Sequence, residues 1–396
     1  MKMPVDMKAV FESITELNDA SEMPVSLALV IDESAPFDLI HCIREACMPT
    51  DHASVHVCSF DQYDHEGIPS AAIDLAIVVA ALDQRTGSIV DRLHNEGIPS
   101  MIVTTMPELV QEIAQEESHP LLSDDVVAPD PSVDGSSLPE TDDANLEPYP
   151  LTIDRQDSLF MRMGQWVVDV YDTKRLAFAL SFPFVRKPLA IETVVSTSVQ
   201  NAGIGLVVVL PGADLPLMTL NQAKMVLRIA AAYGQPLGVE RAKELLGVVG
   251  GAFACRSIAR ELTALIPAIG WGIKAAIGYS GTIGMGFATI AYFEEGHGTA
   301  AQFFEGVRRI KIERARLTAA ASTESSPRAA LITATRVLTS DVCKGAIHAA
   351  QRSIPVIHSA ASTLYKTAGT SPQVVRSMIG DCARYADSLQ KGRKHD

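Results

Sequence analysis

The sequence predicts an α+β protein of two domains: a small N-terminal Rossmann-like α/β unit and a C-terminal all-α, glycine-rich hydrophobic helical domain. Short apolar runs alternate with amphipathic segments over the first 117 residues, as in a parallel sheet covered by helices. An acidic, proline-rich stretch follows, and beyond it the chain becomes apolar, glycine-rich and basic. The expected divisions are 1–117 (α/β unit), 118–150 (linker), 151–320 (helical domain) and 321–396 (amphipathic helices and a basic tail).

Charge is distributed unevenly along the 396 residues, whose 33 Lys and Arg against 47 Asp and Glu give a net charge of −14. Residues 1–150 hold 5 basic and 29 acidic residues, a net of −24, whereas residues 151–396 hold 28 and 18, a net of +10. A chain that is 47% hydrophobic is too apolar to be wholly disordered, and this one is too long for a disulfide-framework miniprotein. The distribution also excludes a uniformly basic nucleic-acid-binding protein.

The N-terminal unit is expected to begin with an amphipathic helix over about residues 5–18. The apolar run at 25–31 predicts a buried parallel strand, and Pro36 stands at the start of a helix. The apolar face of that helix is formed by Phe37, Ile40, Ile43 and Cys47. Further strands are predicted at 54–60, 74–82 and 101–105, and further helices at 86–95 and 108–117. Strands that alternate with helices in this way indicate a small doubly wound unit.

The ends of these strands lack the motifs that bind nucleotides. Parallel sheets bind ligands beyond the carboxyl ends of their strands, but residues 32–38 contain three carboxylates, no Gly and no Lys. Residues 64–67 match a short D-x-x-G phosphate pattern that recurs by chance, and residues 105–108 read Thr-Met-Pro-Glu where a guanine-reading Asn-Lys-x-Asp would stand. We therefore expect a nucleotide-binding scaffold without its chemistry, with no cofactor and no catalytic residue.

A cluster of six histidines and cysteines within residues 41–58 could hold a metal: His41, Cys42, Cys47, His52, His56 and Cys58. Four of them would suffice for tetrahedral zinc or copper, but their spacing matches no zinc-finger pattern. Core cysteines with loop histidines are the favoured interpretation, so no metal site is predicted, and metal binding is the alternative. Scattered cysteines without a C-x-x-C pair, and an N-terminus unlike a signal peptide, favour a reducing, cytoplasmic-side setting.

The stretch from residue 116 to residue 150 contains ten acidic residues, six prolines and no Lys or Arg. Such a segment cannot bury enough apolar surface to offset the entropy lost on ordering, so it is predicted to be a disordered acidic linker. It is interpreted as a solvated spacer. The alternative is a tether that folds back onto the basic half and masks it.

The C-terminal half is predicted to be helical, with helices at 158–171, 220–233 and 239–262 and a break at 182–188 that carries two cations. Residues 275–293, directly after Lys274, run for 19 positions without a charge, which is long enough for a membrane span. Their apolar side chains favour insertion by only about 2 kcal/mol, and four glycines and three Ser or Thr residues oppose it. Insertion is therefore marginal.

Small residues recur every four positions in this run, in the series Gly278–Thr282–Gly286 and Ser280–Gly284–Ala288. This spacing lets two helix backbones approach closely, in a membrane or in a soluble bundle. Five cations between residues 308 and 316 suit either a solvated helix face or a flank beside anionic lipid. The candidate membrane or interaction residues are Lys274, Gly278, Gly281, Gly284, Gly286, Arg308, Arg309, Lys311, Arg314 and Arg316.

Several short motifs in residues 190–295 point to a known family. They read P-G-A-D at 211–214, L-N-Q-x-x-M-V at 220–226, I-A-x-x-Y-G at 229–234 and I-P-x-x-G-W-x-x-K at 266–274. In combination they resemble domain-of-unknown-function family 697, the YcjF-like domain that often accompanies GTPases. The resemblance implies hydrophobic, membrane-associated helices and a separate GTPase as a possible partner. It implies no catalytic residue.

These observations predict a non-enzymatic, membrane-associated protein on the cytoplasmic side, with an α/β interaction module and anionic lipid or the inner membrane leaflet as a partner. The alternative is a soluble, cytoplasmic two-domain interaction protein whose glycine-rich helices form a compact bundle. A divergent nucleotide-binding protein is the third hypothesis. Nucleic-acid binding is not expected, because no aromatic residues are interleaved with the cations.

Overall fold

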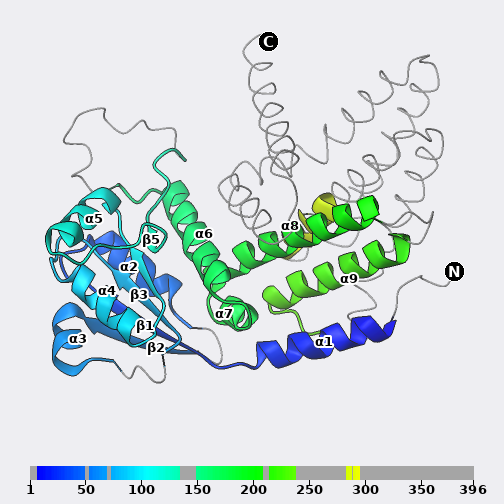
Figure 1. Cartoon of the computed structure of the whole chain (residues 1–396), viewed down its shortest axis with the longest axis horizontal. Coiled ribbons are helices and arrows are strands. Elements are labelled where there is room, and N and C mark those ends of the chain that lie inside the picture. Colours follow the sequence, from blue (N-terminus) through cyan, green and yellow to red (C-terminus); the bar gives the residue numbers. More distant parts are fainter. Residues whose placement is uncertain are drawn as a thin grey trace, which may run out of the picture. The chain divides into compact units, whose positions relative to one another are not determined.

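A computed structural model describes residues 7–49, 53–68, 73–133, 149–207, 214–237, 282–287 and 289–294 (Figure 1). The chain divides into two compact units, Met1–Val307 and Arg308–Asp396, and all described residues belong to the first. Within that unit the structure comprises a parallel sheet with its helices, followed by a series of longer helices. The α/β character expected of the N-terminal region is confirmed.

The sheet has five parallel strands in the order β2-β1-β3-β4-β5. The central strands are apolar and buried on both faces, which explains why their sequences read as continuous hydrophobic runs. The last strand has only two residues and was not predicted, because a segment that short shows no periodicity. The strands are β1 (Val25–Ile31), β2 (Ala53–Ser59), β3 (Leu75–Val79), β4 (Ser100–Val103) and β5 (Val126–Val127).

Three helices pack together against one face of the sheet. A single buried cluster contains alternate residues of the strands together with residues of these helices: Phe60 and Tyr63 of the first, Ile89 and Leu93 of the second and Val110 of the third. These helices are α3 (Phe60–Glu66), α4 (Thr86–Asn95) and α5 (Pro107–Glu116). The first of them was not predicted: the strand expected at 54–60 ends one residue earlier, because the Ser59 hydroxyl accepts a hydrogen bond from the Gln62 amide and caps a helix there.

The first helix of the chain, α1 (Met7–Ser21), packs against helices rather than against the sheet. Its neighbours are α7 (Arg175–Ser181) and α9 (Asp214–Ala232). Val10 and Ile14 on its inner face are buried, whereas Lys8 and Glu12 face solvent and pair at 3.7 Å. The predicted amphipathic character of this segment is therefore confirmed.

Part of the stretch expected to be a linker is structured, which differs from the prediction. It contains β5, and Val126, Val127 and Ala128 are buried. Two side chains of α6 (Ile153–Val170) hold this segment: Trp166 Nε1 donates to Asp125 at 3.1 Å, and Arg162 donates to the Ala128 carbonyl at 2.7 Å. Residues 134–148 lie outside the described residues.

A single buried side chain contacts both segments that border residues 134–148. Arg155 is 1% exposed, and its guanidinium donates to the carbonyls of Pro131 at 3.3 Å and Pro150 at 3.5 Å. The Tyr149 amide bonds to the Thr105 carbonyl at 2.8 Å, which fixes the returning chain beside β4. The chain therefore leaves and re-enters the described structure at one clamped position.

Helix α8 (Pro183–Val207) begins where a break was predicted. The prediction of a break over residues 182–188 is wrong except at Phe182, because Pro183 suits the first position of a helix and Pro188 lies inside it. Pro188 has no N–H for the Phe184 carbonyl. That carbonyl faces Gly164 of α6, where an added Cβ would lie 2.3 Å from it, so α6 and α8 cross closely.

The helical segments contact the sheet directly. Lys174 forms an ion pair with Asp74 at 2.7 Å, and the Tyr171 hydroxyl donates to the Asp74 carbonyl. The predicted helices at 158–171 and 220–233 correspond to α6 and to much of α9. Residues 282–287 and 289–294 are also helical, whereas the predicted helix at 239–262 lies outside the described residues. No helix in the described ranges has the length and apolar character to cross a bilayer.

Candidate functional site

The position at which parallel sheets usually bind ligands lies between β1 and β3 in this fold. The chain passes from β1 to β2 on one side and then to β3 on the other, so the connections after β1 and β3 diverge. Residues after Ile31 and after Val79 therefore border the crevice at the carboxyl edge of the sheet. Asp32 and Asp83 come from these two segments.

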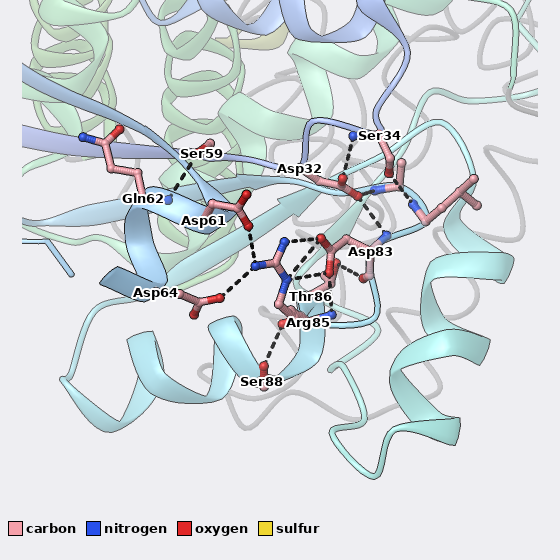
Figure 2. Close-up of polar contacts among 12 residues, drawn as sticks. Asp32, Ser34, Ser59, Asp61, Gln62, Asp64, Asp83, Arg85, Thr86 and Ser88 are labelled. Carbon is pink, nitrogen blue, oxygen red and sulfur yellow. Dashed lines mark hydrogen bonds and ion pairs between the residues drawn. The ribbon is translucent and has the colours of Figure 1, made fainter. Parts of the chain in front are cut away.

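Asp32 occupies this crevice with its own carboxylate (Figure 2). One oxygen accepts the backbone N–H of Ser34 at 2.7 Å, and the other accepts those of Ala81 at 2.9 Å and Asp83 at 3.1 Å. The residue is 1% exposed. Backbone N–H groups in such loops bind phosphate in nucleotide-binding sheets, but here three of them bind the protein's own anion. This arrangement argues against phosphate binding at the crevice.

A network of charged residues lies beside Asp32 and connects α3 to the segment between β3 and α4. Arg85 contacts Asp61 at 2.7 Å, Asp64 at 2.9 Å and Asp83 at 2.6 Å (Figure 2). Arg92 contacts Asp64 at 2.5 Å and lies over the Tyr63 ring, 4.7 Å from its centroid. Three carboxylates and two guanidinium groups thus neutralise most of one another's charge. We call these five residues the Arg85 network: Asp61, Asp64, Asp83, Arg85 and Arg92.

Contacts within the Arg85 network favour the ionised forms of Asp64, Asp83 and Arg85. A hydrogen bond from Arg85 lowers the pKa of Asp83. Burial by itself would raise the pKa of Asp64, but hydrogen bonds from Arg92 and Arg85 outweigh it and the pKa is lowered. Hydrogen bonds from Asp83 and Asp61 raise the pKa of Arg85. Such groups stabilise structure and do not exchange protons near neutral pH.

Replacing Arg85 with glutamine should lower the free energy of unfolding by about 1 kcal/mol at neutral pH, since the pairs are partly exposed. The folded-state pKa of Asp83 is below its ordinary value of 3.8, so this stabilisation is present above about pH 4 and is lost as the pH falls through the folded-state pKa. The two proteins should therefore converge in stability once the pH is below the folded-state pKa of Asp83. Urea titrations followed by Trp166 fluorescence, in a Trp271→Phe background, measure this difference. A difference that is constant with pH, or an equal effect of the exposed control Arg44→Gln, would contradict it.

The cysteines of the His/Cys cluster belong to the core, as predicted. Cys42, Cys47 and Cys58 are buried and unpaired thiols. Burial raises the pKa of Cys42 to about 11, of Cys47 to about 12 and of Cys58 to about 11, so these thiols stay protonated and unreactive at neutral pH. His52 lies outside the described residues. Within the described ranges, no three His, Cys, Asp or Glu side chains converge on a possible metal site.

Of the candidate membrane or interaction residues, only Gly284 and Gly286 are described, and they lie in the helical residues 282–287. An added Cβ on Gly286 would lie 2.3 Å from a methyl carbon of Val194 in α8, so this glycine permits a close helix contact. The remaining candidates lie outside the described residues: Lys274, Gly278, Gly281, Arg308, Arg309, Lys311, Arg314 and Arg316.

A buried polar network lies one turn from this glycine contact. The hydroxyl of Thr282 accepts hydrogen bonds from Asn201 of α8 and Gln222 of α9, each at 2.9 Å, and all three residues are at most 3% exposed. Farther along, Glu294 pairs with Lys187 at 3.0 Å. The contact with Asn201 places Thr282 near the C-terminal end of α8, and the contact with Lys187 places Glu294 near its N-terminal end. The helical residues 282–287 and 289–294 therefore run antiparallel to α8.

Sequence reasoning missed the internal role of Asp32, the Arg85 network and the buried polar network. The sequence showed a carboxylate directly after a buried strand, where it would repel phosphate, but two of the three hydrogen-bond donors to Asp32 are distant in sequence. Ala81 lies 49 residues from Asp32, and Gln222 lies 60 residues from Thr282. His119 contacts Asp91, 28 residues away in the sequence, at 2.6 Å.

No family model, curated protein or solved structure matches the chain. The resemblance of residues 190–295 to the YcjF-like family stays a prediction.

Proposed function

We propose that the chain is a non-enzymatic, membrane-associated protein on the cytoplasmic side. Its C-terminal region would form an all-α domain that docks onto or embeds in the bilayer, and its α/β unit would serve as an interaction module. The non-enzymatic part of this proposal rests on the Asp32 carboxylate. It accepts hydrogen bonds from three backbone N–H groups at the edge of the sheet where parallel sheets usually bind ligands. A separate GTPase is a candidate partner, from the resemblance alone.

The membrane part of the proposal rests on charge and composition in the C-terminal half. Residues 275–293 contain no charge, and five cations follow between 308 and 316. Cations near a membrane surface each contribute about 1 kcal/mol of attraction to anionic lipid. The close contact at Gly286 supports helices built for tight packing, which membrane and soluble bundles share.

Flotation of the full-length protein with lipid vesicles tests this proposal. The protein should float with vesicles that contain phosphatidylglycerol and should float less with phosphatidylcholine alone, in a salt-sensitive manner. The variant Arg308→Gln/Arg309→Gln/Lys311→Gln should bind anionic vesicles about 100-fold more weakly, since three cations contribute about 1 kcal/mol each. The charge-matched control is the tail variant Lys391→Gln/Arg393→Gln/Lys394→Gln, which should change binding less.

Two results would contradict the proposal. One is a protein that is recovered entirely in the soluble fraction of a cell lysate and does not float with anionic vesicles. The other is equal weakening by the two triple variants, which would mean that only overall charge matters.

A soluble, cytoplasmic interaction protein is the second candidate function. It is favoured by α1, whose inner face packs on α9 and whose Lys8 and Glu12 face solvent, so this side of the helices carries a water-facing layer. Expression without detergent as a single monodisperse species, together with no flotation, would select this candidate. Aggregation without detergent would select the membrane-associated one.

A further inference from the structure

A cavity of about 410 Å³ lies between α2 (Phe37–Ala46), α6 and the start of α8. Its walls are largely apolar, with Met48 following α2, Phe160 in α6 and Phe184 in α8. Met48 is 69% exposed and borders the cavity. An exposed apolar side chain beside a largely apolar cavity makes this surface a candidate interaction site. We call this cavity and its lining the α2–α6 groove.

The polar groups in the groove do not suit a small polar ligand. Such ligands are oriented by several polar groups that converge on them. Among the described residues of the lining, the one amide side chain is that of Gln156, which donates to Cys42 Sγ at 3.1 Å and is thus engaged inside the protein. Glu45 is the one charged side chain among these described lining residues. The groove therefore offers apolar contact along its walls and one carboxylate.

The exposed charged residues of α2 and α6 are mostly acidic. At the start of α8, Arg186 donates to the Ala179 and Leu180 carbonyls and Lys187 pairs with Glu294, so both cations are engaged within the protein. Asp38 and Glu45 both act electrostatically on Cys42, which places them near the groove. Asp154 and Asp157 flank Gln156 on α6 and are exposed. Arg44 is the exposed cation on α2. On α6, Arg155 is buried, and Arg162 donates a hydrogen bond to the Ala128 carbonyl. A basic partner is therefore complementary to this rim.

We propose that the α2–α6 groove binds an amphipathic helix of a partner protein, with its apolar side chains between Met48 and Phe160 and a flanking Lys or Arg against Glu45. This proposal rests on the function of the α/β unit as an interaction module. An apolar helix face in a groove is a common recognition mode, and methionine adapts readily to the shape of its partner.

Fluorescence anisotropy with the full-length protein and a labelled peptide tests the proposal. The probe is an amphipathic Leu–Lys helix of about 18 residues, compared with a scrambled Leu–Lys peptide and an amphipathic Leu–Glu peptide. The amphipathic Leu–Lys peptide should bind at least about tenfold more tightly than either. Glu45→Lys should weaken it about fivefold, and Met48→Ser about tenfold.

Two exposed residues outside the groove provide matched controls. Glu112→Lys on α5 reverses the same charge, and Leu122→Ser removes an apolar side chain that is 65% exposed. Neither should change peptide affinity. Equal binding of the Leu–Lys and Leu–Glu peptides, or equal effects of Glu45→Lys and Glu112→Lys, would overturn the proposal. Tighter peptide binding by Arg308→Gln/Arg309→Gln/Lys311→Gln would also overturn it, because the chain's own basic segment would then occupy the groove.

The vesicle assay separates this proposal from the membrane role. Glu45→Lys and Met48→Ser should float with anionic vesicles as the unmodified protein does. Loss of peptide binding in proteins that still float is the expected result. An unmodified protein that floats but does not bind the Leu–Lys peptide overturns the groove assignment and leaves the membrane proposal standing.

Discussion

Replacing Asp32 with alanine is expected to lower the free energy of unfolding by about 4 kcal/mol. Its carboxylate accepts three backbone hydrogen bonds, and hydrogen bonds to a charged acceptor contribute roughly 1.5–3 kcal/mol each. Without it, the Ala81 N–H is left buried without an acceptor, and the segments that leave β1 and β3 lose two of the hydrogen bonds that join them. Urea denaturation followed by Trp166 fluorescence, in the Trp271→Phe background, measures the loss.

Added sulfate distinguishes the anion role of Asp32 from general destabilisation. In Asp32→Ala the three N–H groups are free to bind an external anion, so sulfate should restore stability beyond the general stabilisation that it gives the unmodified protein. Asp32→Asn is the matched control, because its amide fills the space and keeps one acceptor oxygen. It should lose about half as much stability and respond to sulfate as the unmodified protein does. An equal sulfate response in all three proteins would show that Asp32 does not occupy an anion site.

Replacing Arg155 with methionine is expected to lower the free energy of unfolding by about 3 kcal/mol. Methionine keeps much of the length of the side chain but removes the hydrogen bonds to Pro131 and Pro150 and the contact with the Tyr149 ring, whose centroid lies 6.0 Å away. Two carbonyls that face a buried guanidinium then lose a charged donor. Urea denaturation with the same fluorescence probe measures this effect.

Arg162→Met is the matched control for Arg155, because it lies on the same helix and also donates to a backbone carbonyl but is exposed. Arg162→Met should lower the free energy of unfolding by less than about 1 kcal/mol. Hydrogen exchange gives a local readout, since the Tyr149 amide is bonded to the Thr105 carbonyl and should exchange faster in Arg155→Met. Equal losses for the two variants, or unchanged exchange at Tyr149, would contradict the clamp.

The central strands of the sheet were predictable because they are buried on both faces. The expected strand at 25–31 coincides with β1, and those at 54–60, 74–82 and 101–105 overlap β2, β3 and β4. A continuous apolar run between turn residues is a local feature, so one sequence suffices to locate it. The prediction of a break at 182–188 was wrong because the effect of a proline depends on tertiary contacts. Pro183 begins α8, and Pro188 lies inside that helix where it crosses α6 at Gly164.

The candidate site was far less predictable. The charge of Asp32 indicated that it would repel phosphate, but two of its three hydrogen-bond donors lie beyond β3. The pairing of Arg85 with Asp61 and Asp64 depends on α3 and α4 packing against the same face of the sheet. These contacts join segments that are distant in sequence, and no local pattern specifies which carboxylate meets which guanidinium.

By itself, the sequence determined the alternation of strands and helices, the uneven charge and the burial of the three cysteines, because each depends on composition or on hydrophobic patterning within a short window. Only the tertiary structure decided the strand order, the internal carboxylate at the β1–β3 crevice and the clamping of the acidic stretch at Arg155. The physical reason is that a buried polar group must find its partner wherever the fold brings one, and that partner can lie anywhere along the chain.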